Sequence, residues 1–130
     1  MTRLAALALA FLVAACTTTP RAGAGAGADW LAGSWLMLGA ETDYPLSCNS
    51  DEPIVYESDG RYQTYGESGS WRLDDGRLVE TATEVDAAGD PEATVIGRPA
   101  LSRVDRTGPD AFRKTYADGT VATFRRCPAP

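Results

Sequence analysis

The residue types that most often do chemistry in enzymes are scarce in this chain or poorly placed. Its 130 residues include no histidine, which removes the usual base for a serine or cysteine nucleophile and the commonest metal ligand. Lys114 is the only lysine, so a serine–lysine nucleophile has a single candidate base and no motif to support it. Acid–base chemistry would therefore rest on carboxylates.

Carboxylates are abundant, with 18 Asp and Glu residues, but their spacing does not build a catalytic pair. Asp51-Glu52 and Asp74-Asp75 are adjacent, and neighbours on a strand point to opposite faces. Asp74-Asp75-Gly76 is instead typical of a hairpin turn. The spaced oxygens of a calcium loop and the glycine loop that binds phosphate are both missing from the sequence. We expect no catalytic residues, no metal and no cofactor.

The charge balance limits the partners. Twelve basic against 18 acidic residues give a net charge of −6. The longest basic run is the pair Arg125-Arg126, too short to follow a phosphate backbone, so nucleic-acid binding is not expected. An acidic surface would be repelled by anionic lipid headgroups and would favour a basic partner, although it also serves solubility.

The first 28 residues indicate export and anchoring. Residues 1–15 combine a positive start with an apolar run too short to span a bilayer. They end in Val13-Ala14-Ala15-Cys16, which resembles the lipobox of bacterial lipoproteins. That resemblance implies that Cys16 carries diacylglycerol and palmitate-type chains, and that Thr17 directs sorting to the outer membrane, with the domain facing the periplasm. An ordinary secretory signal is the alternative. Residues 16–28 form an Ala/Gly-rich tether.

Residues 29–130 predict an all-β domain. Short strand candidates alternate with turn signals, and no helical period is present. The candidates cover 34–39, 53–58, 61–66, 69–74, 77–84, 93–97, 100–106, 110–117 and 119–126. Asp-Gly pairs at 59–60, 75–76 and 118–119 predict type I′ hairpin turns. Consecutive hairpins favour a small antiparallel up-and-down β-barrel of about eight strands, with an open sandwich as the alternative.

The cysteines fit an oxidising compartment. If Cys16 carries lipid, Cys48 and Cys127 remain as a pair. A disulfide between them would close about 80 residues and stabilise the fold by roughly 4.5 kcal/mol in the chain-entropy model. It would also fasten an early loop to the end of the last strand, and closure of a barrel predicts that the ends of the domain meet in space.

The domain start resembles the lipocalin-like, or calycin, superfamily, whose first strand opens with Gly-x-Trp after a short 3₁₀ turn. Here the motif is Gly33-Ser34-Trp35. The resemblance implies that Trp35 closes one barrel end beneath a basic residue of the last strand, Arg125 or Arg126. The architecture also resembles periplasmic metalloprotease inhibitors, which act through a free N-terminal segment that lipid would block here.

The remaining candidates for binding are aromatic: Tyr44, Tyr56, Tyr62, Tyr65 and Trp71. Most aromatics in such a barrel form the core, but Tyr62 and Tyr65 are three apart and cannot share a face of one strand. An outward tyrosine beside an acidic rim would suit a protein contact. The sequence thus predicts a non-enzymatic, lipid-anchored periplasmic binding module for a small apolar ligand or a basic envelope protein. The alternatives are an inhibitor of an envelope protease or lysozyme and a structural accessory of an outer-membrane complex.

Overall fold

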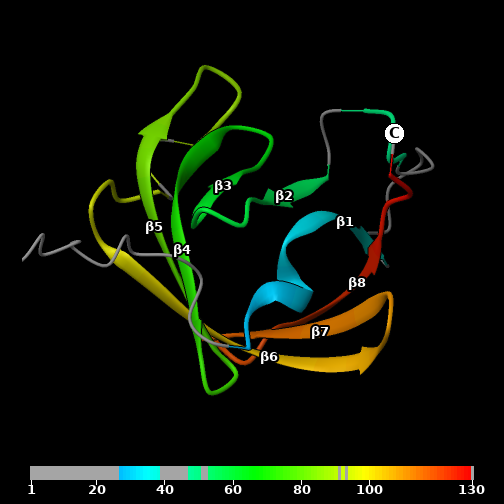
Figure 1. The fold of residues 1–130 in the computed structure, drawn as a ribbon. Helices are drawn as coiled ribbons and strands as arrows, with labels where there is room; N and C mark the ends of the chain where they lie inside the picture. Colours follow the sequence, from blue (N-terminus) through cyan, green and yellow to red (C-terminus); the bar gives the residue numbers. More distant parts are fainter. Residues whose placement is uncertain (1–26, 39–46, 51–52, 91, 93, 130) are drawn as a thin grey trace, which may run out of the picture.

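The computed structural model describes residues 27–38, 47–50, 53–90, 92 and 94–129. This part of the chain folds into one 3₁₀ turn followed by eight strands (Figure 1). The elements are η1 (Asp29–Leu31), β1 (Gly33–Leu38), β2 (Ile54–Tyr56), β3 (Arg61–Gln63), β4 (Glu67–Asp74), β5 (Arg77–Val85), β6 (Pro99–Gly108), β7 (Ala111–Tyr116) and β8 (Val121–Arg126). The predicted signal peptide, Cys16 and Tyr44 lie outside the described residues.

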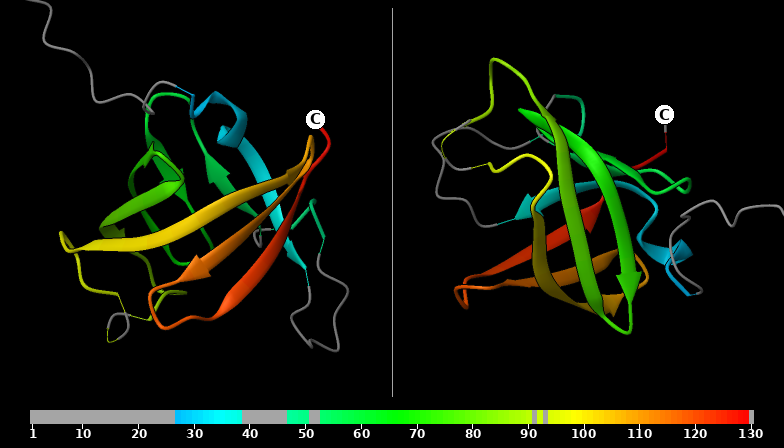
Figure 2. Two further views of the ribbon diagram at one scale, coloured as in Figure 1. Left: turned by 90° about the horizontal axis from the view of Figure 1, so that it is seen from below. Right: turned by 90° about the vertical axis from the view of Figure 1, so that its left-hand side faces the viewer.

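The strands pair in chain order, each antiparallel to the next, and β1 closes the ring by pairing with β8. Trp35 opposes Ile54 on one side and Arg126 on the other. Figure 2 shows the closed ring from below and the long β4–β5 hairpin along its side. The predicted eight-stranded up-and-down barrel is confirmed, and the open sandwich is wrong.

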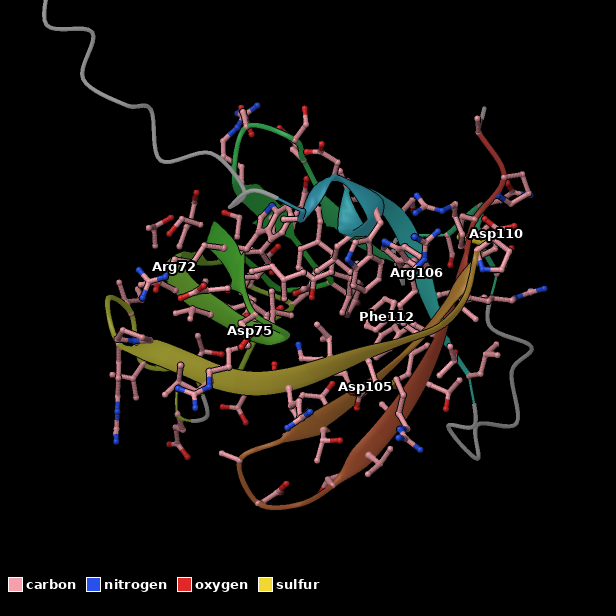
Figure 3. The ribbon with its side chains drawn as sticks, turned by 60° about the horizontal axis from the view of Figure 1, so that its bottom comes forward. Arg72, Asp75, Asp105, Arg106, Asp110 and Phe112 are labelled. Atoms are coloured by element: carbon pink, nitrogen blue, oxygen red, sulfur yellow. A yellow bond between two sulfur atoms is a disulfide. The ribbon has the colours of Figure 1, made fainter. Side chains whose placement is uncertain are left out.

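Alternation along the strands fills the barrel. Inward positions carry large apolar side chains, and Figure 3 shows Phe112 inside the ring. The buried core cluster comprises Ala28, Leu31, Trp35, Tyr56, Tyr62, Trp71, Leu73, Leu78, Val104, Phe112 and Phe124. The Phe112 and Phe124 rings stack with 4.7 Å between centroids, and Trp35 meets Phe112 edge-on at 4.8 Å. The rings of the core are therefore in direct contact.

The three Asp-Gly turns do not share one geometry. Asp75 and Gly76 both have positive φ, 48° and 74°, as a type I′ turn requires. At Gly60 and Gly119 only the glycine does, at 88° and 87°. There the connection has three residues and ends in a bulge glycine, because Gly119 N–H donates to the Tyr116 carbonyl at 3.0 Å. The type I′ prediction is confirmed for the middle turn and wrong for the other two.

The strand predicted at 93–97 is wrong. Of that stretch the structure describes 94–97, which includes no strand and ends in a turn where Gly97 has φ +77°. The Gly97 N–H donates to the Ala82 carbonyl, and β5 then pairs directly with β6 through Thr81 and Pro99. The segment thus crosses one end of the barrel as part of a connection.

The barrel has two unlike ends. The closed end carries η1, the turns after β2, β4 and β6, and the end of β8, whereas the mouth carries the connections after β3, β5 and β7. Cys48 and Cys127 form the predicted disulfide, with 5.6 Å between Cα atoms and a sequence separation of 79. It joins the segment before β2 to the residue that follows β8.

Candidate functional site

The closed end holds the residues of the Gly-x-Trp motif. Trp35 is fully buried, and the Arg126 guanidinium lies 4.2 Å from the centroid of its ring. Arg126 also donates hydrogen bonds to the backbone carbonyls of Ala32, at 2.8 Å, and of Trp30. Arg125, the other candidate for this contact, is exposed and faces outward. The arginine therefore ties η1 and β1 to the last strand and seals the end of the barrel.

Gly33 permits this seal. It has φ +135°, a conformation that side chains with a Cβ rarely adopt. A Cβ at this position would also collide with Nη1 of Arg126. The glycine is required both by the backbone turn and by the arginine that packs over it. These contacts hold the closed end of the barrel together. A recess of about 350 Å³ at this end is bordered by Trp30, Asp75 and Arg106.

Nearer the mouth, the interior contains an ion pair. Lys114 Nζ lies 2.6 Å from Oε2 of Glu80, with the two side chains only 5% and 11% exposed. Tyr56 donates its phenol to the other Glu80 oxygen at 2.6 Å. Burial, and then the neighbouring Glu80 charge, raise the pKa of Tyr56 well above its usual value. Lys114 Nζ also lies 5.0 Å from the ring centroid of Tyr116, so this ring packs against the ammonium group.

Two further aromatic candidates are also part of the wall. Tyr62 is buried and donates to Oε1 of Glu67 at 2.9 Å, and burial raises the pKa of its phenol. The Trp71 indole N–H donates to the Glu57 carbonyl at 2.9 Å, while its ring lies edge-on to Tyr56 at 5.3 Å. Tyr56, Tyr62 and Trp71 therefore hold the barrel together and are enclosed by it.

Tyr65 is different, because its side chain stands outside the barrel and is 62% exposed. It borders a groove of about 740 Å³ on the outer face of the first three strands. The floor consists of outward residues that lie side by side in the register, Ser34, Val55 and Gln63. One wall comes from the segment around Cys48, and the other from Tyr65 and the connection after β5. The remaining lining residues are Ser50, Pro53, Thr64, Gly66, Asp86, Ala87 and Ala88.

An acidic rim adjoins this groove. Glu67, Glu84 and Asp86 surround a smaller recess of about 180 Å³, which shares Gln63, Thr64 and Asp86 with the groove. Glu67 is held in place, since its second oxygen accepts a hydrogen bond from Thr94 at 2.8 Å. The rim has carboxylates without a basic residue among its lining, so it would attract a cationic group.

The sequence indicated Tyr65 as one of five aromatic candidates for binding, but it gave no sign of the groove, and the ion pair was not predicted. Apart from Tyr65, Gln63 and Asp86, the groove is lined by small neutral residues from separate segments of the chain, and these carry no motif. The ion pair had a signal, because Lys114 lies two residues from both Phe112 and Tyr116 and so shares their face of the strand. Its partner Glu80 is 34 residues away, and only strand order brings the two together.

Scans of this chain against protein-family models and against curated proteins find no match. The closed eight-stranded antiparallel barrel is compatible with a lipocalin-like fold. Among the described residues, no helix is long and apolar enough to cross a membrane. In the same part of the chain, no three His, Cys, Asp or Glu side chains gather into a group that could hold a metal ion.

Proposed function

We propose that this protein is a non-enzymatic, lipid-anchored binding module of the cell envelope, whose binding site is the outer groove beside Tyr65. The observation that carries the proposal is the contrast between Tyr65 and the enclosed aromatics. Tyr56, Tyr62 and Trp71 are all at most 3% exposed, whereas Tyr65 presents most of its ring beside an open groove. An exposed tyrosine at a recess is a common anchor of protein interfaces.

The filled interior supports a macromolecular partner over a small apolar ligand. Rings in contact occupy the closed end, and the Glu80–Lys114 pair occupies the next layer, so an apolar molecule entering there would have to displace charged groups. The outer groove carries no such cost. The acidic rim favours a basic protein surface, which fits the inhibitor of a basic envelope hydrolase better than the structural accessory.

The anchor is proposed from the sequence alone. Cys16 would carry lipid, residues 17–28 would form the leash, and the barrel would face the periplasm from the outer membrane. Replacing Cys16 with serine should leave an uncleaved or soluble precursor. If Cys16→Ser still fractionates with the outer membrane through detergent-free washes, the lipid anchor is wrong.

The groove is tested by site-specific photo-crosslinking in cells. A photoreactive phenylalanine replaces Tyr65 in one strain and Ile96 in another, because Ile96 is 59% exposed but does not line the groove. We expect a discrete protein adduct from position 65 that is absent from position 96. Identical adducts from both positions, or no protein adduct from position 65, would overturn the assignment of the groove.

Basic lysozyme provides a direct probe of the inhibitor hypothesis. The purified protein should slow its muramidase activity, and Tyr65→Ala should relieve that inhibition. Lysozyme activity unchanged by excess protein would exclude this target class while leaving the crosslinking result to identify the partner.

A further inference from the structure

The floor of the groove beside Tyr65 has a definite width. Its outward residues Ser34, Val55 and Gln63 oppose one another across β1, β2 and β3. Adjacent strands of a sheet are about 4.8 Å apart, so the backbones of β1 and β3 stand roughly 10 Å apart beneath the groove. The floor therefore spans two strand spacings between its walls.

Both walls are held against this floor. On the β1 side, the residue that follows β8 donates its N–H to the Ser34 carbonyl at 2.8 Å and carries the disulfide to Cys48. On the β3 side, the Asp86 N–H donates to the Gly66 carbonyl at 2.9 Å and ties the connection after β5 to the one after β3 (Figure 1). A Cβ on Gly66 would come 2.5 Å from the Cα of Gly89, so these two connections meet backbone to backbone. The groove is therefore formed before a partner arrives.

The width decides which kind of segment fits. An α-helix with its side chains is about 10–12 Å across and would collide with the walls, which include the Tyr65 ring. A single extended chain needs only about 4.8 Å on each side. Its backbone N–H and C=O groups require partners once water leaves, and the Gln63 amide and the Ser34 hydroxyl can each donate and accept. The groove thus suits an extended segment.

The groove and the acidic recess beside it differ in charge. Of the described residues that line the groove, only Asp86 is charged. The recess adds Glu67 and Glu84, and it is bordered by Gln63 and Thr64, which also line the groove. A side chain that leaves an extended segment at this shared border would pass directly into the recess. A neutral stretch with one basic residue therefore matches the two spaces together.

Within the recess, Glu84 is the carboxylate that a partner can engage. Both oxygens of Glu67 already accept hydrogen bonds, from the phenol of Tyr62 at 2.9 Å and from the hydroxyl of Thr94 at 2.8 Å. One oxygen of Asp86 accepts two backbone N–H groups of its own turn. Glu84 is exposed, and no other described residue forms a hydrogen bond or an ion pair with its side chain.

We propose that the groove holds an extended segment of a protein partner, and that one lysine or arginine side chain of this segment enters the recess and pairs with Glu84. Groove shape selects the extended backbone, and the carboxylates select the cation. The inference rests on the proposed function, because the segment would occupy the same groove. It goes further by stating which part of the partner binds and in what conformation.

The test starts from the protein adduct that forms at position 65. Mass spectrometry identifies the crosslinked partner residue, and a short synthetic peptide spanning that residue is the probe. The peptide is titrated against the full-length Cys16→Ser chain, and a second peptide replaces its basic residue with citrulline or norleucine. Glu84→Gln alters the recess. Glu92→Gln is the matched control, because Glu92 is exposed but lines neither the groove nor the recess.

We expect the peptide to bind alone and to displace the intact partner. Loss of the peptide's charge, or Glu84→Gln, should weaken binding about fivefold, and the two changes together should cost little more than either one. Glu92→Gln should change binding less than twofold, and thermal melts of both variants should match the parent.

Three results would overturn this inference while leaving the groove in place: an intact partner that binds although its peptide does not, a crosslinked segment without a basic residue, or equal losses in the two glutamate variants. An adduct with a second copy of this chain would also overturn it. The absence of any adduct from position 65 would remove the groove assignment itself, and this inference with it.

Discussion

Replacing Lys114 with methionine tests whether the buried ion pair holds the barrel together. The change keeps most of the side-chain volume but removes the ammonium group 2.6 Å from Glu80. Glu80 would then keep the Tyr56 phenol as a partner while remaining 11% exposed. Stranding a buried carboxylate in this way costs about 3–5 kcal/mol. A domain of this size has roughly 5–10 kcal/mol in total, and each lost kcal/mol lowers Tm by about 4–8 °C.

A double-mutant cycle separates the pair from the loss of a single charge. Glu80→Leu should also destabilise, because it leaves the Lys114 ammonium buried among rings. The combined Glu80→Leu/Lys114→Met variant should recover most of the lost stability, since replacing a whole buried pair with apolar groups is often neutral or favourable.

The assay is urea unfolding followed by tryptophan fluorescence, with Arg113→Met as the matched control. Arg113 lies on the same strand but faces outward, so its loss should change stability by less than about 0.5 kcal/mol. If Lys114→Met costs no more than Arg113→Met, or if the double variant is as unstable as the sum of the singles, Lys114 and Glu80 do not act as one buried unit.

Three further outcomes follow from the structure. Trp35→Ala should cost about 3–5 kcal/mol in chemical unfolding, against about 1 kcal/mol for Asp75→Ala in the exposed turn; similar costs would contradict the seal at the closed end. Reduction of Cys48–Cys127 should remove about 4.5 kcal/mol, measured as the shift in unfolding midpoint with and without reductant. The raised pKa values of Tyr56, Tyr62 and Tyr116 favour the neutral phenols in the folded state. The contribution of these phenols to stability should therefore be constant up to about pH 10, and stability should fall above it, with phenolate absorbance from these residues appearing only as the protein unfolds.

The sequence by itself determined the class of fold. Period-two alternation fixes which face of each strand is apolar, and the turn residues fix where the chain reverses, so both are local properties. The same holds for Gly33, whose backbone conformation only glycine adopts readily. The Cys48–Cys127 disulfide is not local, and it was predicted because these two cysteines remain as a pair when Cys16 is assigned to lipid. The prediction of a strand at 93–97 was wrong because a strand also needs a pairing partner, which is not a local property. Val95 and Ile96 supply β propensity, but no neighbouring strand was left to pair with them, because β5 and β6 pair directly.

The tertiary structure alone decided what the surface presents. Alternation predicts that Tyr62 and Tyr65 diverge, but only the placement of the connections after β3 and β5 turns Tyr65 into the wall of a groove. Lys114 and Glu80 meet although 34 residues separate them, because strand order and register bring their inward positions together across the barrel. Local patterns set which side of a strand a residue occupies, whereas its neighbours across the sheet are set by register and closure. The interior pair and the groove both depend on that second, non-local step.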